Sequence, residues 1–274
     1  MKIWDATIQL CTNLEKVHRT VIFETVMKTV TMHGFSQITK AVSSVIRCIH
    51  RERQEEKIMN RRKTRIQKLT LAAFFVAIEI LMAVTPIGFI PVGAINITTM
   101  HLPVILSGII LGPAYGALTG FVFGLTSMLK ATFAPNITSF CFSPFITVGG
   151  VHGNFASLFI AFVPRITLGV LSFYIYRALR RVKKTDGNKV FSRIAASAIA
   201  AGINTLIHTL FVMGSIWLFF GSAYANAAGI TVGAVIVAVL TSNGILEIVL
   251  ASIVIPALVR ALKPSLERMG FYDR

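Results

Sequence analysis

The sequence predicts an all-α membrane protein with six transmembrane helices and both termini in the cytosol. Hydrophobic residues make up 54% of its 274 residues and charged residues only 14%, whereas an ordinary soluble domain carries about 25% charged residues. Six apolar segments of helical length follow residue 68. The basic residues lie almost entirely on one side of these segments. Composition, segment length and charge placement therefore agree on a chain whose main solvent is lipid.

The six predicted spans follow from the thickness of a bilayer, whose core of about 30 Å needs about 20 apolar residues in a helix. The spans are residues 69–86, 98–111, 113–130, 155–178, 193–220 and 231–261. The second is short, and only Gly112-Pro113 separates it from the third. Because Pro favours the first position of a helix, we expect these two helices to form a hairpin with a tight turn.

Residues 1–58 differ from the rest of the chain. They contain nine Lys and Arg and six Asp and Glu, without a long apolar run. The apolar core of a cleavable signal peptide is also missing there. Met59 begins a basic stretch that suits the start of a membrane protein, so residues 1–58 are either an upstream extension outside the functional protein or a basic helix on the membrane surface. The predicted membrane domain is residues 59–274.

Charge placement predicts the orientation. Segments 61–68, 177–193 and 260–274 hold 16 of the 18 Lys and Arg that follow residue 58, and connections 87–97, 131–154 and 221–230 hold none. The positive-inside rule then places both termini in the cytosol of a multi-pass protein in the cell membrane. A basic collar beside anionic lipid headgroups accounts for the net charge of +16. We therefore expect a lipid bilayer, and no nucleic acid, as the partner of these charges.

Small residues recur every fourth position in two places. The longer series is Gly108, Gly112, Gly116, Gly120 and Gly124. Within a membrane helix this spacing makes a flat strip that a neighbouring backbone can approach closely. We expect the strip to pack the second and third predicted helices together. The first predicted helix carries a shorter pair of the same kind, Ala73 and Ala77.

Polar residues inside the predicted spans are the best indicators of function, because an ionisable group at mid-bilayer costs about 2.5–3.5 kcal/mol. These residues are Glu79, Arg165, Asn204, His208, Asn243 and Glu247. Asn204 and His208 lie four residues apart, on one helix face, and so do Asn243 and Glu247. Their depths within the spans are similar to that of Arg165. We therefore expect the last three helices to bring these side chains together.

Structural roles compete with ligand binding at each of these positions. Arg165 and Glu247 could neutralise each other, while His208, Asn204 and Asn243 could hold helices together by hydrogen bonds. Glu79 could be paired structurally, or it could serve with His208 and Glu247 as a proton site of a carrier. Pro164 also leaves the carbonyl of Ile160 without its helical donor, free to face a ligand or water.

The outward connections are unusually apolar. Residues 87–99 and 131–154 carry several Phe and no charged residue, which is rare for loops in water. They are predicted either to fold back as lids over a ligand or to lie buried in the membrane interface. As lids, their polar side chains would hydrogen-bond a ligand. The candidates are Asn96, Asn136, Ser139 and Ser143.

Motifs of several enzyme classes are absent from the sequence. It contains no G-x-x-x-x-G-K-[ST] phosphate loop, no H-E-x-x-H zinc motif and no G-x-S-x-G nucleophile elbow. Its three cysteines show no metal-ligand spacing. We therefore expect a protein that is not an enzyme, holds no metal and binds no ATP by a phosphate loop.

Several short motifs follow one another along the predicted helices. They are Ala73-Phe74-Phe75-Val76-Ala77, Pro91-Val92-Gly93-Ala94, His101-Leu102-Pro103-Val104, Leu111-Gly112-Pro113, Gly120-Phe121-Val122-Phe123-Gly124-Leu125-Thr126-Ser127 and Val163-Pro164-Arg165-Ile166 with Gly169. With the six-helix pattern, they make residues 66–262 resemble the substrate-binding S components of energy-coupling factor (ECF) vitamin transporters. Residues 1–58 have no counterpart in this resemblance.

The resemblance implies an S-component bundle that captures a vitamin from outside and closes its first and third connections over it. Such a component docks on a membrane scaffold subunit with two ATPases, so partner subunits use the ATP and this chain needs no cofactor. In the family the small-residue pair of the first helix is the docking surface, which corresponds here to Ala73 and Ala77.

The third connection suggests the vitamin, because residues 134–140 and 143–145 are similar to the subgroup associated with pantothenate. Pantothenate has a carboxylate, for which Arg165 is the expected counter-ion. Asn204, His208 and Asn243 would bind its amide and hydroxyl groups, and Glu247 completes the predicted site. Folate and riboflavin stay open as ligands, although riboflavin lacks the carboxylate. A stand-alone proton-coupled carrier also remains possible on these residues.

Overall fold

The computed structural model describes residues 35–92, 95–135, 138–148, 150–182, 189–228, 237 and 240–268. The chain divides into two units, residues 1–63 and residues 64–274. In the first unit, the described residues form the beginning of helix α2 (Phe35–Val84). Its side chains near residue 50 are exposed, and Arg51 and Glu55 form an i,i+4 ion pair of 3.6 Å. Exposed pairs of this kind add little stability.

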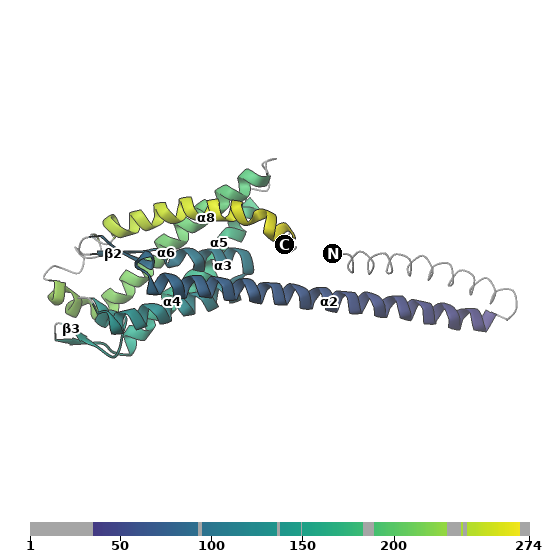
Figure 1. The fold of residues 1–274 in the computed structure, drawn as a ribbon, viewed down its shortest axis with the longest axis horizontal. Coiled ribbons are helices and arrows are strands. Elements are labelled where there is room, and N and C mark those ends of the chain that lie inside the picture. The colour runs from purple at the N-terminus through teal and green to yellow at the C-terminus, as the bar shows by residue number, and fades with distance from the viewer. Residues whose placement is uncertain are drawn as a thin grey trace. The chain divides into compact units, whose positions relative to one another are not determined.

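The second unit contains the rest of α2 and a bundle of five further helices (Figure 1). These helices are α3 (His101–Leu111), α4 (Pro113–Phe133), α5 (Phe155–Val182), α6 (Lys189–Ala228) and α8 (Ile245–Arg268), with a π-helical segment η4 (Leu240–Gly244) before α8. The prediction that helices dominate the membrane domain is confirmed.

Four described helices are long and apolar enough to cross a membrane. They are Arg62–Val84, Phe155–Arg181, Arg193–Gly221 and Ile245–Ser265. Of the six predicted spans, the second corresponds to α3, which has only 11 residues. The third corresponds to α4, which has 21 residues but is interrupted by glycines, hydroxyl residues and Lys130 that lower its hydropathy. By length and composition alone, the described residues thus support four of the six spans of a multi-pass membrane protein.

The tight turn between α3 and α4 is confirmed. Helix α3 ends at Leu111, and Pro113 is the first residue of α4. Between them Gly112 has φ of 105°, a backbone conformation that costs a residue with a Cβ atom but not glycine. The chain reverses within one residue, so α3 and α4 pack side by side.

The glycine strip has a different main partner from the one predicted. A Cβ atom at Gly116 would lie 2.3 Å from the carbonyl oxygen of Gly169, and one at Gly120 equally close to the carbonyl oxygen of Arg165. Both of these carbonyls belong to α5. Gly116 also approaches Gly108 of α3. The predicted contact between α3 and α4 is therefore present, but the strip mainly allows the backbone of α5 to approach α4.

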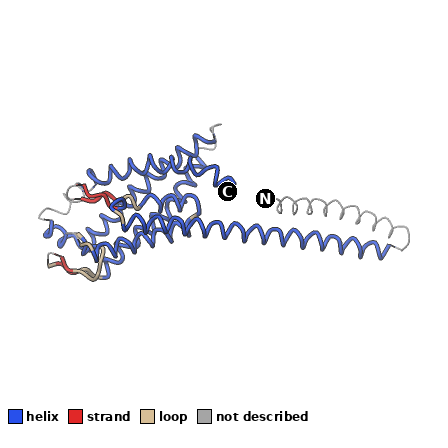
Figure 2. The backbone as a smooth tube through the Cα atoms, viewed as in Figure 1, coloured by secondary structure: helices blue, strands red, loops and turns tan. Residues whose placement is uncertain are grey.

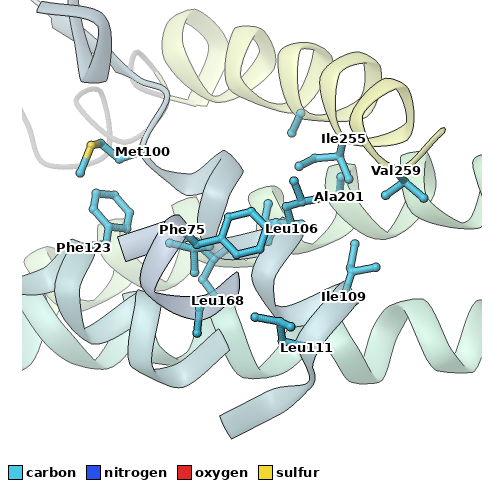
Figure 3. Packing of buried hydrophobic residues seen from close by; sticks show 14 residues of the cluster. Phe75, Met100, Leu106, Ile109, Leu111, Phe123, Leu168, Ala201, Ile255 and Val259 are labelled. Carbon is cyan, nitrogen blue, oxygen red and sulfur yellow. The ribbon is translucent and has the colours of Figure 1, made fainter. Parts of the chain in front are cut away.

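The main hydrophobic core joins α2, α3, α4, α5, α6 and α8 (Figure 3). Phe75 of α2, Leu106 of α3 and Leu168 of α5 are among its buried side chains, and Ile255 and Val259 contribute the face of α8. Lipid surrounds the bundle rather than water, so close packing rather than the hydrophobic effect holds these helices together.

Two antiparallel hairpins interrupt the helical pattern, so the all-α prediction is incomplete. The first pairs β1 (Phe89–Val92) with β2 (Ile95–Thr98), and the second pairs β3 (Thr147–Val148) with β4 (Val151–His152). Both lie in the connections that are predicted to face outward, at the same end of the bundle (Figure 2). Short helical turns, η1 (Pro86–Gly88) and η2 (Ser139–Cys141), accompany them.

A second apolar cluster anchors the longer connection. Phe140 and Cys141 of η2 are fully buried against Ile160 of α5 and against Val212 and Phe220 of α6. The hydroxyl of Ser157 also donates to the carbonyl of Phe140 at 2.8 Å. This connection is therefore packed on the ends of α5 and α6 instead of extending into solvent.

We predict that Gly116→Ala destabilises the protein, because the added methyl group meets the backbone of α5. Overpacking of this kind typically costs about 1–3 kcal/mol. Gly214→Ala in α6 is the control, because its Cβ would meet nothing within 4 Å. The measurement is the thermal unfolding midpoint in detergent, which we expect to fall for Gly116→Ala only. Equal midpoints for the two variants would contradict the role of the strip.

Candidate functional site

Three ionisable side chains from three helices come together in the bundle. Arg165 of α5, His208 of α6 and Glu247 of α8 are 7%, 8% and 8% exposed. Arg165 is close enough to both of the others to interact with them electrostatically. The structure therefore brings together the residues that the sequence placed at similar depths.

Glu247 is held by the connection that contains the β1–β2 hairpin. Its Oε1 accepts hydrogen bonds from the backbone N–H of Thr98, at 2.9 Å, and from the Thr98 hydroxyl, at 2.8 Å. Among the described residues, no ion pair within 4.0 Å joins Glu247 to Arg165. The carboxylate thus attracts Arg165 without occupying its guanidinium group.

Arg165 fills the gap that Pro164 leaves in α5. The guanidinium Nη1 donates to the carbonyl of Ile160, which lacks its usual helical donor because residue 164 is proline. The predicted free acceptor is therefore taken by the neighbouring side chain rather than left for a ligand or water.

Two aromatic rings lie beside the same guanidinium. Its carbon atom is 5.6 Å from the ring centre of Phe123 in α4 and 5.0 Å from that of Phe142 in the third predicted connection. Both contacts are cation–π interactions, which strengthen where water is excluded. Arg165 Nε has no hydrogen-bond partner among the described residues, so one donor of this buried cation stays available.

Asn204 and His208 occupy one face of α6, as predicted. Asn204 is fully buried, and its side-chain amide donates to the carbonyl of Leu168 at 2.8 Å. That bond is the interhelical contact that the structural interpretation expected. However, Asn204 Oδ1 and His208 Nε2 have no partner in the described part of the chain. Buried polar atoms are rarely left unpaired, so these two await a ligand or water.

His101 belongs to the same cluster and was not predicted as a site residue. It is 1% exposed at the start of α3 and interacts electrostatically with Glu247 and His208. Neither ring nitrogen makes a hydrogen bond of standard geometry to a described residue. A histidine at the start of an apolar helix was the signal that the sequence offered. Thr98 and the two rings beside Arg165 were also missed, because their roles depend on tertiary contacts.

The other predicted binding residues lie in or beside the connections. Ser143 is buried, and its hydroxyl pairs with that of Thr132 at 2.7 Å. Ser139 is buried in η2, and Asn243 is 8% exposed in η4. Asn136 lies outside the described residues. Asn96 is on β2, but its side chain is outside the described part.

The remaining candidates lie on α2. Glu79 is fully buried, and neither carboxylate oxygen has a hydrogen-bond partner among the described residues. No structural pair of the predicted kind is therefore seen for it in that part of the chain. Ala73 and Ala77 are exposed and share a face with the exposed Leu69 and Ile80. In the described part of the chain, the small-residue pair is left uncovered.

The cluster combines a buried cation with unpaired hydrogen-bonding atoms. Arg165 can neutralise an anionic group, and His208, Asn204 and His101 can exchange hydrogen bonds with neutral polar groups. Phe123 and Phe142 supply apolar surface beside the cation. This arrangement suits a small molecule that carries one carboxylate, several polar groups and an apolar part.

Comparison with known families gives a match over most of the membrane domain. The family model described as "ECF transporter, substrate-specific component" matches residues 67–259. The chain belongs to this family. It is thus a multi-pass transport protein of the cell membrane rather than an enzyme, and the resemblance inferred from the motifs is confirmed.

Two curated relatives are similar to this substrate-specific component over most of its length. One is "Pantothenic acid transporter PanT" of Lactococcus lactis subsp. cremoris, 34% identical over 203 residues that cover 73% of this chain and 97% of the relative. The other is "Pantothenate transporter PanT" of Leuconostoc mesenteroides subsp. mesenteroides, 28% identical over 221 residues that cover 77% of this chain and 98% of the relative.

We predict that Glu247→Ala loosens the first hairpin of this S component. The change leaves the backbone N–H of Thr98 without its acceptor, which costs about 1–3 kcal/mol in a buried position. Hydrogen exchange at Thr98 should accelerate about tenfold or more, since 1.4 kcal/mol corresponds to a factor of ten.

Glu267→Ala is the matched control on the same helix, because Glu267 is exposed and pairs only with Lys263 among the described residues. Exchange mass spectrometry of the peptide containing Thr98 makes the comparison. If hydrogen exchange in this peptide is equally fast in the two variants, Glu247 does not hold the hairpin.

Proposed function

We propose that the chain is the pantothenate-binding subunit of an ECF-type uptake transporter. The observation that carries the proposal is the state of Arg165, a buried cation that keeps a free donor because Glu247 is bound to Thr98. A carboxylate ligand would complete this charge arrangement. The two relatives named as pantothenate transporters agree with that chemistry.

Pantothenate carries the groups that the polar cluster can use. Its carboxylate would meet Arg165, and its amide and hydroxyl groups would meet His208, Asn204 and Asn243. Its gem-dimethyl group would lie against Phe123 and Phe142. Glu247 then acts indirectly, by holding Thr98 and the hairpin beside the ligand. Asn96, Asn136, Ser139 and Ser143 would line the connections that close over the ligand.

The same proposal fixes the orientation and the number of crossings. With α3 as the second crossing and α4 as the third, the chain would cross the membrane six times and keep both termini in the cytosol. The lack of Lys and Arg in connections 87–97, 131–154 and 221–230 supports this orientation. The hairpins and the ligand cluster then open toward the exterior, where the vitamin is captured.

Energy would come from partner subunits. Residues 59–274 would form the transport unit and dock through Ala73 and Ala77 on a membrane scaffold subunit that works with two ATPases. The exposure of this small-residue pair supports a docking role, because small side chains let another helix approach closely. The absence of a phosphate loop from the sequence agrees with ATP hydrolysis by a partner.

Folate is a weaker candidate ligand, because it is larger than pantothenate. Riboflavin would leave Arg165 without a carboxylate.

A stand-alone proton-coupled carrier is the second candidate function. The observation that favours it is Glu79, a fully buried carboxyl group without a described partner, since buried acids of this kind serve as proton sites in carriers.

Arg165→Ala is expected to weaken pantothenate binding at least about 100-fold, which corresponds to about 2.7 kcal/mol. Removing one partner of a desolvated charge pair typically costs this much or more. Arg177→Ala, in an exposed position of the same helix, should leave the affinity unchanged. Calorimetry on the purified protein measures both affinities. An unchanged affinity in Arg165→Ala would exclude the counter-ion role.

The double variant Ala73→Leu with Ala77→Leu should bind pantothenate normally and yet fail to take it up, since Leu side chains block close docking. The control is Ala257→Leu with Ala261→Leu, an exposed pair of equal spacing on α8. Uptake into cells, measured beside binding to purified protein, separates the two steps. Uptake that survives the first change but is abolished by a protonophore would favour the carrier instead.

A further inference from the structure

Lys130 differs from every other charged residue in the membrane part of the sequence. Between residues 69 and 176, and between residues 194 and 259, the charged residues are Glu79, Lys130, Arg165 and Glu247. Three of these are at most 8% exposed. Lys130 is partly exposed and lies in the last turn of α4, at the end of the bundle where the two hairpins lie. Of these four charged residues, Lys130 is thus the one that is not buried, and it lies at the end of the bundle that is proposed to face outward.

The described contacts leave the charge of Lys130 without a carboxylate. Its Nζ lies 4.1 Å from the ring centre of Phe89, in a cation–π contact. No ion pair of Lys130 occurs among the described residues. As a base in the last turn of α4, it also faces the negative end of the helix dipole. Neither interaction neutralises the ammonium group, so it can still attract an anion from outside.

A line of side chains connects Lys130 with the ligand cluster. Phe123, Ser127 and Lys130 are four and three residues apart, so they lie on one face of α4. The hydroxyl of Ser127 is buried without a partner in the described part of the chain. Phe123 touches the guanidinium of Arg165. Seven residues of helix place Lys130 about 10 Å along the axis from Phe123.

Lys130 also acts at the base of the hairpin that borders the cluster. Phe89, which it contacts, is the cross-strand partner of Thr98, and Thr98 is bound by Glu247. The same pair of residues is therefore held by a cation from α4 and by a carboxylate from α8. An anion that approaches Lys130 arrives beside this hairpin and at the outer end of the line that leads to Arg165.

We propose that Lys130 is the capture residue for the carboxylate of the ligand, which then passes along α4 to Arg165. This inference rests on the proposed function, because it requires an anionic ligand. A single unscreened charge at the outer end of the site raises the association rate of an anion, and salt removes the effect. Lys130 then raises the affinity through the rate of capture, while the contacts around Arg165 set the rate of dissociation.

Stopped-flow association with the full-length protein in detergent tests this role. The probes are pantothenate and its neutral alcohol, in which a CH2OH group replaces the carboxylate. Lys130→Gln should slow pantothenate association about threefold to tenfold at low ionic strength, without changing its dissociation rate or the association rate of the alcohol. Lys130→Arg should restore the rate. At about 1 M salt the difference between variants should disappear.

Phe89→Leu is the matched control, because it removes the ring that Lys130 contacts and keeps the charge. In this variant, the ratio of the association rate of pantothenate to that of the neutral alcohol should be the same as in the unaltered protein. The capture role is overturned if Lys130→Gln slows both probes equally, as loss of hairpin support would do, or slows neither. If the unaltered protein binds pantothenate, either result overturns the capture role alone. If the unaltered protein does not bind pantothenate, the proposed function is overturned as well.

Discussion

The site depends on the hydrogen bonds that Thr98 donates to Glu247. An arginine and a glutamate buried in one cluster would ordinarily form an ion pair and satisfy each other, because isolated charges in the membrane interior are costly. Here the backbone N–H and the hydroxyl of Thr98 engage the carboxylate, while the guanidinium keeps an unpaired Nε. The connection with the β1–β2 hairpin thereby maintains a buried positive charge that can accept an anionic ligand.

The position of Arg165 in turn depends on close backbone packing between α4 and α5. Gly120 lies so near the carbonyl of Arg165 that a Cβ atom would not fit there. Helix α4 also supplies Phe123, which contacts the guanidinium. One helix therefore sets the depth of the cation through its glycines and provides part of its surroundings through an aromatic side chain. Phe142 of the third predicted connection also lies beside the same group.

Much of this could be predicted from the sequence. Apolar length and charge placement predicted the helices, Gly112-Pro113 predicted the turn, and polar residues within apolar helices predicted the cluster of Arg165, His208 and Glu247. The hairpins were missed because their short strands lack a clear alternating pattern. Thr98 and the partner of the glycine strip were missed because periodicity indicates which face of a helix packs but not which neighbour covers it.

The most direct measurement is the structure of the protein with pantothenate bound, determined by crystallography or electron cryomicroscopy. We expect the ligand carboxylate within about 3 Å of an Arg165 nitrogen, with Glu247 still bound to Thr98. An ion pair between Arg165 and Glu247 in that complex, with the carboxylate elsewhere, would contradict the account.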